Sequence, residues 1–288
     1  MRVSLANPSD SHRRREQGLM LLLMSPALLV VFVLLLIPLA WLFWQSFYGN
    51  GLTLEHYSRI WHDEIYWRTF ALTFKISVIV TALTLLLGYP VAYVAAKLPR
   101  RSAIVVLMLV VLPFWTSVLV RTYAWLILLQ RTGVVNSVLM SLGLTHSPIT
   151  LANNQLGTVI AMVHILLPFM ILPLYATMQK IPTDLMMAGS SLGGSPLHVF
   201  LRVFFPMSLS GVLAGTTLVF VLCLGFYITP ELMGGGRTIM VSMVVARNVE
   251  LYNQWGAASA VSVVLLLCVL AVFYIVSRII PLDRILGK

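Results

Sequence analysis

Long apolar runs separated by short polar segments dominate this chain. Six of them are long enough to cross a bilayer, because a membrane-spanning helix needs about 20 mostly apolar residues. They cover residues 20–44, 71–96, 103–129, 157–178, 207–229 and 255–276. The pattern predicts an all-α, polytopic membrane protein with six transmembrane helices.

The first apolar run reads as an uncleaved helix. A secretory signal has a shorter apolar core of about 7–15 residues that ends at small residues. This run instead ends in Trp41, Phe43 and Trp44, which suit an interfacial aromatic belt. We therefore predict an N-terminal tail (1–19), a first helix with an external loop (20–67), a core of five helices (68–280) and a C-terminal tail (281–288).

Composition agrees with a membrane protein. The chain is 59% hydrophobic and only 10% charged, whereas about a quarter of the residues in a soluble domain are charged. The net charge of +10 does not indicate nucleic-acid binding, because the basic residues are scattered at the ends of apolar runs. Cys223 and Cys268 lie inside such runs, so they predict no disulfide framework.

The basic residues also predict the orientation, because cytoplasmic segments of membrane proteins are enriched in Lys and Arg. An even number of spans places both termini on one side. That side would hold Arg2, Arg13, Arg14, Arg15, Lys97, Arg100, Arg101, Lys180, Arg202, Arg278, Arg284 and Lys288. The opposite side would hold only Arg59, Arg68, Lys75, Arg131, Arg237 and Arg247, with Arg121 assigned to neither. We expect both termini in the cytoplasm.

A polar segment punctuated by Gly and Pro interrupts the apolar pattern between the fourth and fifth spans. Pro182 suits a first helical position, and Asp184 would then lie near the positive end of the helix dipole. Gly193 would end this helix in a left-handed conformation. Ser195-Pro196 would cap and open a second short helix. We expect a cytoplasmic corner of two short helices. Beyond it, Gly211 and Gly215 would allow close helix packing.

The sequence offers no catalytic set. It has no Gly-x-x-x-x-Gly-Lys-Ser/Thr phosphate loop, no His-Glu-x-x-His pair and no nucleophile elbow. We predict that the chain is not an enzyme and binds no metal or cofactor. If ATP drives it, a separate subunit must hold the ATP and Mg²⁺.

Several polar and aromatic residues in the spans are candidates for a translocation path. Glu231 could attract a cation at the outer end of the fifth span, or pair with an Arg at the interface. Arg121 could be a counter-ion to Glu231, a headgroup anchor or a path residue. Aromatic side chains could line a path for an aliphatic polycation or simply pack. The full candidate set is Tyr89, Tyr93, Trp115, Arg121, Tyr123, Trp125, Tyr227 and Glu231.

The segment between the fourth and fifth spans resembles the cytoplasmic loop of permease subunits in ATP-driven importers. That family has Glu-Ala-Ala, three residues, Gly and an Ile-x-Leu-Pro ending. Ala188, Gly193 and Pro206 match it, whereas Met187 replaces the acid and Gly189 the second alanine. The resemblance implies an ATPase-coupling loop at 180–206. Its predicted contact residues are Pro182, Asp184, Met187, Ala188, Gly189, Leu192, Gly193, Ser195 and Pro196.

Further motifs resemble the spermidine/putrescine branch of these permeases. They are Leu87-Gly88-Tyr89-Pro90, Pro113-Phe114-Trp115-Thr116-Ser117, Val120-Arg121-Thr122-Tyr123-Ala124-Trp125, Leu167-Pro168-Phe169 and the segment from Tyr227 to Gly235. The resemblance implies the MetI-like fold of type I importer permeases and a bacterial inner-membrane location. It also implies ATPase subunits, a second permease and a periplasmic binding protein as partners. Polyamine import by alternating access is the expected function, with another organic solute or an ion-coupled secondary carrier as alternatives.

Overall fold

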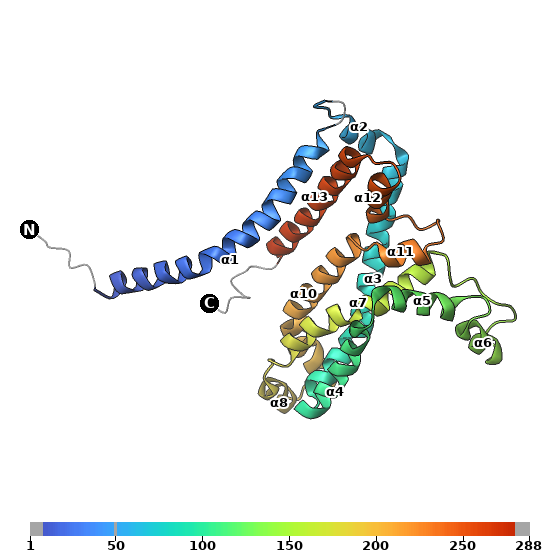
Figure 1. Ribbon diagram of the computed structural model, residues 1–288. Coiled ribbons are helices and arrows are strands. Elements are labelled where there is room, and N and C mark those ends of the chain that lie inside the picture. Colours follow the sequence, from blue (N-terminus) through green and yellow to red (C-terminus); the bar gives the residue numbers. More distant parts are fainter. Residues whose placement is uncertain (1–7, 49–50, 280–288) are drawn as a thin grey trace, which may run out of the picture.

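The computed structural model describes residues 8–48 and 51–279, and Figure 1 shows that they form an elongated assembly of helices. This part of the chain contains no β-strand, only an isolated bridge between Tyr48 and Leu52. The prediction of an all-α fold is confirmed. The elements are α1 (Pro8–Ser46), α2 (Glu55–His62), α3 (Glu64–Lys97), α4 (Arg100–Val111), η1 (Leu112–Trp115), α5 (Val118–Leu129), α6 (Val134–Ser141), α7 (Gln155–Met178), α8 (Thr183–Ser191), α9 (Pro196–Val199), η2 (Phe200–Phe204), α10 (Phe205–Leu224), α11 (Ile228–Met233), α12 (Val241–Glu250) and α13 (Trp255–Ile279).

Six helical stretches in the described residues are long and apolar enough to cross a membrane, as predicted. They are Leu22–Ser46, Glu64–Lys97, Val118–Ser141, Gln155–Met178, Pro196–Leu224 and Trp255–Arg278. The second, fourth and sixth contain the predicted runs 71–96, 157–178 and 255–276, and the first contains 22–44. The third and fifth differ from the prediction.

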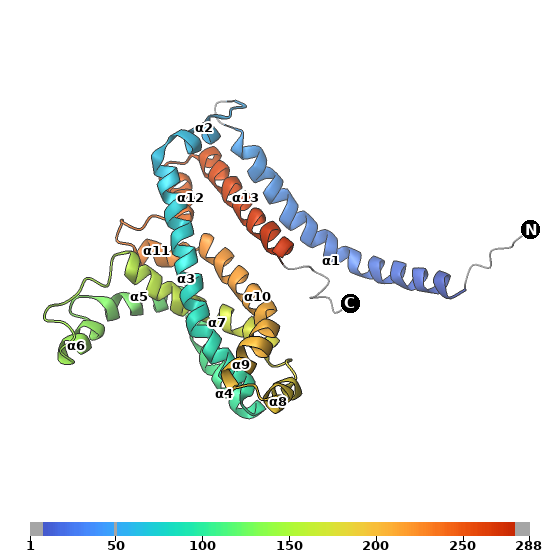
Figure 2. The same cartoon turned by 180° about the vertical axis from the view of Figure 1, so that it is seen from behind.

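The centre of the molecule is a bundle of α3, α7 and α10, with α7 packed against both of the others (Figures 1 and 2). Glycines allow this close approach. A Cβ added to Gly211 would lie 2.8 Å from Thr177, and one added to Gly215 would lie 2.8 Å from the Met170 sulfur. The predicted role of these two glycines in helix packing is confirmed. Small residues let membrane helices gain van der Waals contact where lipid supplies no hydrophobic force between them.

The third predicted span, 103–129, is not one helix. α4 ends at Val111, a 3-10 turn follows, and α5 begins at Val118. Pro113 explains the break, because proline has no N–H to donate and clashes with the preceding turn. Ser117 then caps α5, accepting a hydrogen bond from the N–H of Leu119. The external stretch predicted at 130–155 also contains a helix, α6.

The predicted fifth span, 207–229, is displaced toward the N-terminus. The helix already begins at Pro196, passes through the π-helical segment η2 and ends at Leu224. The π-helical turn ends just before the Phe205-Pro206 pair, where the missing N–H of Pro206 leaves a carbonyl without its usual donor. Gly225 ends α10. The short helix α11 follows and carries Glu231.

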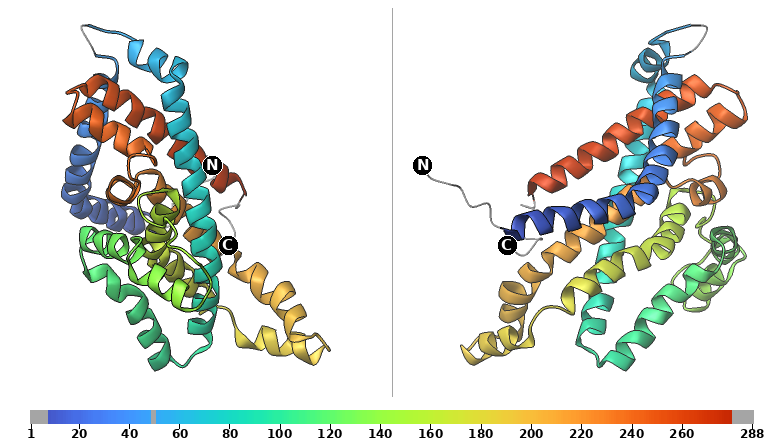
Figure 3. Two further views of the ribbon diagram at one scale, coloured as in Figure 1. Left: turned by 90° about the vertical axis from the view of Figure 1, so that its right-hand side faces the viewer. Right: turned by 60° about the vertical axis from the view of Figure 1, so that its left-hand side comes forward.

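The ends of the chain lie partly outside the described residues. α1 begins at Pro8, so residues 8–19 of the predicted tail are helical. Residues 1–7 and the predicted tail 281–288 are not described. α1 contacts α13, which also packs on α12 and α2 (Figure 3). The edge-to-face ring pair Trp41–Trp255, with centroids 6.2 Å apart, joins α1 to α13.

Candidate functional site

The predicted corner between the fourth and fifth spans is present. α8 covers Thr183–Ser191, so Pro182 occupies the N-cap position and not the first helical position that was predicted for it. Gly193 has a φ of +84°, so it ends the helix in the predicted left-handed conformation. The Ser195 hydroxyl accepts a hydrogen bond from the N–H of His198 and opens the next helix. That second helix continues through η2 into α10, so the corner connects directly to a membrane-spanning helix.

Val199 explains one departure from the family pattern. A Cβ on Gly189 would lie 3.2 Å from a Val199 methyl, and one on Gly194 would lie 3.0 Å from it and 2.8 Å from the carbonyl oxygen of Gly189. Val199 itself is buried. The corner is therefore closed around this one side chain. Glycine rather than alanine at position 189 suits that packing.

The outward face of the corner is apolar and uncovered by the rest of the described chain. Leu192 is 89% exposed, and Leu185, Met187 and Leu197 are exposed as well. Figures 2 and 3 show the corner projecting beyond the bundle, at the end opposite α2. Asp184 is the only acid on α8. Burying one such leucine is worth about 1.5–3 kcal/mol, so this face is suited to docking on another protein.

The two tyrosines of α3 pack against the helix that emerges from the corner. The Tyr89 hydroxyl and the Ser208 hydroxyl are 2.9 Å apart. Tyr93 packs edge-to-face against Phe200 and Phe204 of η2, with ring centroids 5.5 and 4.9 Å apart. These contacts join the last turns of α3 to the helix that emerges from the corner. Both tyrosines therefore act in packing at the corner's end of the bundle.

Glu231 is paired, but not with Arg121. Its Oε1 lies 3.6 Å from Arg247 Nη2, which links α11 to α12. Its Oε2 is buried and has no hydrogen-bond partner among the described residues. Arg121 is only 7% exposed and stacks on the Phe114 ring, 5.7 Å from its centroid. The counter-ion hypothesis for Arg121 is therefore wrong. The sequence did not identify Arg247 as the partner of Glu231, because nothing in the pattern of residues predicts a contact between α11 and α12.

Three of the remaining aromatic candidates lie near the break in the third crossing, and the fourth, Tyr227, lies elsewhere. Trp125 packs on His164 of α7, with ring centroids 5.5 Å apart. Trp115 is 88% exposed and Tyr123 is exposed on α5. Tyr227 lies between α10 and α11, next to the helix that carries Glu231. A hydrogen bond of 3.1 Å between the hydroxyls of Thr122 and Thr229 joins α5 to α11. The eight candidates thus occupy separate places: the end of α3, the α4–α5 break with α5, and the α11–α12 pair.

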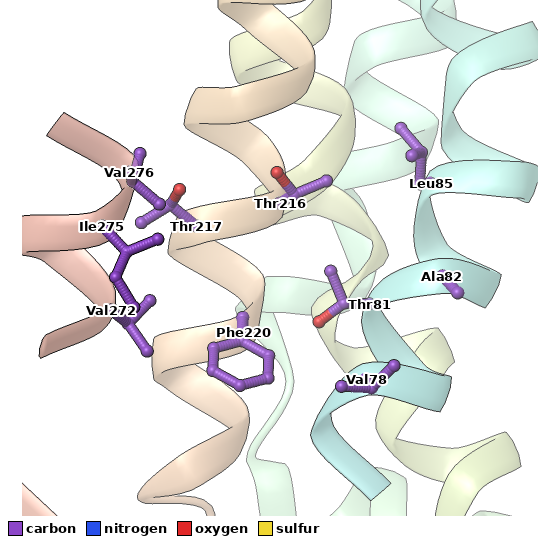
Figure 4. Close-up of a pocket in the computed structure, with 10 residues that line it drawn as sticks. All are labelled: Val78, Thr81, Ala82, Leu85, Thr216, Thr217, Phe220, Val272, Ile275 and Val276. Carbon is purple, nitrogen blue, oxygen red and sulfur yellow. The ribbon is translucent and has the colours of Figure 1, made fainter. Parts of the chain in front are cut away.

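A cavity of about 450 Å³ opens between α3, α10 and α13 and contains none of the predicted site residues (Figure 4). Its lining is apolar apart from hydroxyl groups such as that of Thr81, whose oxygen is buried without a partner. It has no charged side chain with which to hold a polar solute. Within the described residues, no group of three or more His, Cys, Asp or Glu side chains could hold a metal ion.

These features define a class of protein: a polytopic membrane protein with an exposed apolar corner at one end of its helical bundle. Comparison with known proteins gives the family. Residues 85–282, well over half of the chain, match the model for the binding-protein-dependent transport system inner membrane component. The chain belongs to this family and is a permease subunit of an ATP-binding-cassette importer.

Named relatives support the assignment. The chain is 33% identical to the spermidine/putrescine transport system permease protein PotB of Haemophilus influenzae, over 80% of this chain and 81% of that protein. PotB of Escherichia coli is also 33% identical, over 80% and 84%. The inner membrane ABC transporter permease protein YdcU of Escherichia coli is 30% identical, over 85% and 88%.

Solved structures confirm the fold. A crystal structure of a bacterial ABC transporter that imports the acidic polysaccharide alginate contains a chain similar to this one, with a TM-score of 0.66 at 18% identity. That match covers 95% of this chain and 99% of the other. A second structure of a bacterial alginate ABC transporter, in complex with a periplasmic protein bound to an alginate pentasaccharide, gives a TM-score of 0.71 at 16% identity, covering 95% and 96%.

Proposed function

We propose that this permease imports a polyamine such as spermidine or putrescine by alternating access. ATPase subunits that carry ATP and Mg²⁺ would dock on the α8 corner. A second permease subunit and a periplasmic binding protein would complete the transporter. Both termini and the corner would face the cytoplasm, as the distribution of Lys and Arg favours. The main support for the docking is the exposed apolar face of α8, which a short turn joins to the helix that continues into α10.

The continuous helix supplies the mechanical link. A movement of α8 would cross the short turn at 192–195 and then reach α10 through α9 and η2, which form one continuous helix with it. The edge-to-face packing of Tyr93 on Phe204 of η2 would pass the same movement to α3. Coupling then requires only that the ATPase pair bind the corner better in one state of the bundle than in the other.

Gly193→Asp tests the docking of the ATPase. The substitution places a charge on the proposed contact face, and burying an unpaired carboxylate costs on the order of several kcal/mol. We expect the assembled transporter in membrane vesicles to lose ATP-driven uptake while the mutant chain inserts at normal abundance. Gly143→Asp is the matched control, because Gly143 also has positive φ (+68°) and open space around its Cβ position but follows α6. Normal uptake by the Gly193 variant would refute the docking.

The cargo needs a separate measurement. Vesicles that contain the wild-type transporter and its cognate binding protein should take up labelled spermidine or putrescine when ATP is supplied. An excess of an uncharged solute of similar length should not compete. If another organic solute displaces the polyamine, the cargo assignment fails while the importer assignment stands. Uptake that follows a proton or sodium gradient without ATP would instead support an ion-coupled carrier.

A further inference from the structure

A polar cavity of about 400 Å³ lies at the end of α7 that is opposite the α8 corner. One wall is the connection that precedes α7, at residues 150–154, and another is the connection between α11 and α12, at Gly235 and Arg237. Gln130 and Arg131, just after α5, complete the lining. Figure 3 shows α6 and the start of α7 far from the corner. With the corner in the cytoplasm, this cavity would open on the outer side.

The cavity contains two cations and no acid. Arg131 and Arg237 both line it and are exposed, and no Asp or Glu is among the lining residues. The sequence has no acid at all between Glu64 and Asp184. The two ion pairs within the described residues involve other arginines. A cavity with this charge repels a polyamine and is suited to an anionic group that comes from outside the chain.

The walls of the cavity are fixed by close contacts. A Cβ added to Gly235 would lie 2.6 Å from the carbonyl oxygen of Asn153, so the two connections touch. Both residues have a φ of +57°, a left-handed conformation that Gly and Asn adopt most easily. The buried Asn136 side chain donates to the carbonyls of Gln130 and Ile149 and accepts from the N–H of Ile149. A preformed site of this kind loses little conformational freedom when it binds a ligand.

The donors around the cavity suit a carboxylate. A guanidinium holds its N–H groups in a planar fork that matches the two oxygens of a carboxylate. The amide side chains of Gln130 and Asn153 are further N–H donors in the lining. Asn154 begins α7 by accepting a hydrogen bond of 2.9 Å from the N–H of Gly157. The positive end of this helix dipole is therefore beside the cavity and adds to its attraction for an anion.

We propose that this cavity is a carboxylate-binding site, and that its occupant is an acidic side chain of the periplasmic binding protein. The lining residues belong to outer connections and are mostly polar, so the occupant arrives from water and not from lipid. A carboxylate held by both arginines would join the start of α7 to the connection that follows α11. It would thereby link the binding protein to the element that carries Glu231. The inference rests on the proposed function for the identity of the partner, but not for the affinity of the cavity for a carboxylate.

Removing one charge at a time tests the recognition. Arg131→Gln and Arg237→Gln are assembled with the other subunits in proteoliposomes, and ATP-driven uptake is measured against the concentration of solute-loaded binding protein. We expect the half-saturating concentration to rise about 5- to 30-fold in each variant, because a charge that pairs across an interface is lost. The maximum rate should change little. Arg59→Gln is the matched control, because Arg59 is exposed on the outer helix α2 and does not line the cavity.

Competition by simple anions tests the chemistry of the site. Acetate should raise the half-saturating concentration of wild type more than chloride does at equal ionic strength, because a carboxylate fits the guanidinium fork. The two salts should act equally on the Gln variants, where only general screening remains. Equal competition by acetate and chloride in wild type would overturn the carboxylate site.

A chemical cross-link identifies the source of the carboxylate. Arg237→Lys keeps the positive charge and supplies a primary amine, which a water-soluble carbodiimide joins to a contacting carboxylate as an amide. We expect mass spectrometry to find this lysine joined to an Asp or Glu of the binding protein. Arg59→Lys is the control and should give no such product. A product with the second permease, or none, would overturn the proposed occupant.

The wild-type transporter separates the two possible failures. If its uptake does not depend on any periplasmic binding protein, the proposed function fails, and this inference fails with it. If uptake does depend on the binding protein but both Gln variants keep the wild-type half-saturating concentration, only the carboxylate site is overturned. A raised concentration together with the cross-link to the binding protein supports the site and its occupant.

Discussion

The α3–α7–α10 bundle and the α1–α13 pair are both apolar, yet they are held in different ways. In the bundle, Gly88, Gly211 and Gly215 allow close contact between the helices, and most of α7 is buried. In the other region, α13 buries only its first turns, including Ala257, Ala258 and Val261, while its later residues are exposed. α1 is attached near Trp41 and exposes its large side chains from Leu22 to Ile37 almost without interruption.

The difference separates two uses of apolar sequence in a membrane protein. Packing within the chain requires small residues and matched surfaces, because lipid is as apolar as leucine. An apolar helix without such matches can face lipid or another subunit at little cost. The family match begins at residue 85 and includes most of the bundle but not α1. The family model therefore matches α7 and α10 in full, while α1 lies outside it.

The largest expected effect is on the bundle. In Gly211→Ala the new Cβ would lie 2.8 Å from both Cβ and Oγ1 of Thr177, and such overpacking costs about 1–3 kcal/mol. We expect a lower thermal midpoint for the purified chain and less protein in the membrane. Gly225→Ala is the control, because its Cβ would meet nothing within 4 Å. Equal midpoints would show that the bundle is looser than its geometry indicates.

An effect of up to the same size is expected where the bundle meets α12. The buried Thr73 hydroxyl accepts a hydrogen bond of 3.0 Å from the N–H of Val241 in α12. Thr73→Val keeps the shape but leaves that N–H without a partner, which costs about 1–3 kcal/mol.

Thr84→Val is the matched control for this substitution. Thr84 is equally buried, but its hydroxyl bonds only to Thr81 of its own helix. A midpoint that falls for position 73 and stays unchanged for position 84 would locate the loss in the α3–α12 contact. The same fall at both positions would show that any buried hydroxyl of α3 contributes.

Hydropathy predicted the number of spans well and their ends poorly. The second span was placed at 71–96, whereas α3 begins at Glu64, capped by the Asp63 side chain. A helix can continue past the membrane boundary as long as its backbone hydrogen bonds are satisfied. Hydropathy measures only how apolar the side chains are, so it does not locate the end of the helix. The same limit applies to α10, which begins outside the apolar run. Proline positions were visible, but their effects were not: Pro90, Pro168 and Pro173 lie inside helices, and only Pro113 coincides with a break.

The local chemistry of the corner was the part of the candidate site that could be predicted. Gly193 and Ser195 are determined by neighbours within a few residues, so their roles follow from turn and cap preferences. The ion pair between Glu231 and Arg247 could not be predicted, because it depends on how α11 and α12 meet in space. The aromatic candidates failed to gather at one place for the same reason. Aromatic side chains suit packing and binding equally well, and only the fold separates the two.

The smallest effect is expected in α1. It tests whether this helix is as loosely attached as its exposed side chains indicate. Leu34 is 70% exposed to the surroundings of the chain, so Leu34→Ala removes almost no contact within it and should change stability by less than about 0.5 kcal/mol. Trp41→Ala removes the ring contact with Trp255. It should lower the stability by about 0.5–1.5 kcal/mol beyond the loss that the apolar area buried between the two rings accounts for. Thermal midpoints of both variants in detergent measure how much these side chains stabilise the isolated chain. The same measurement on the assembled transporter shows whether they also contact another subunit. A change for Leu34→Ala only in the assembly would show that this face of α1 packs on another subunit. If Leu34→Ala lowered the stability of the isolated chain by more than about 1 kcal/mol, α1 would not be loosely attached, because so large a loss requires a packed side chain.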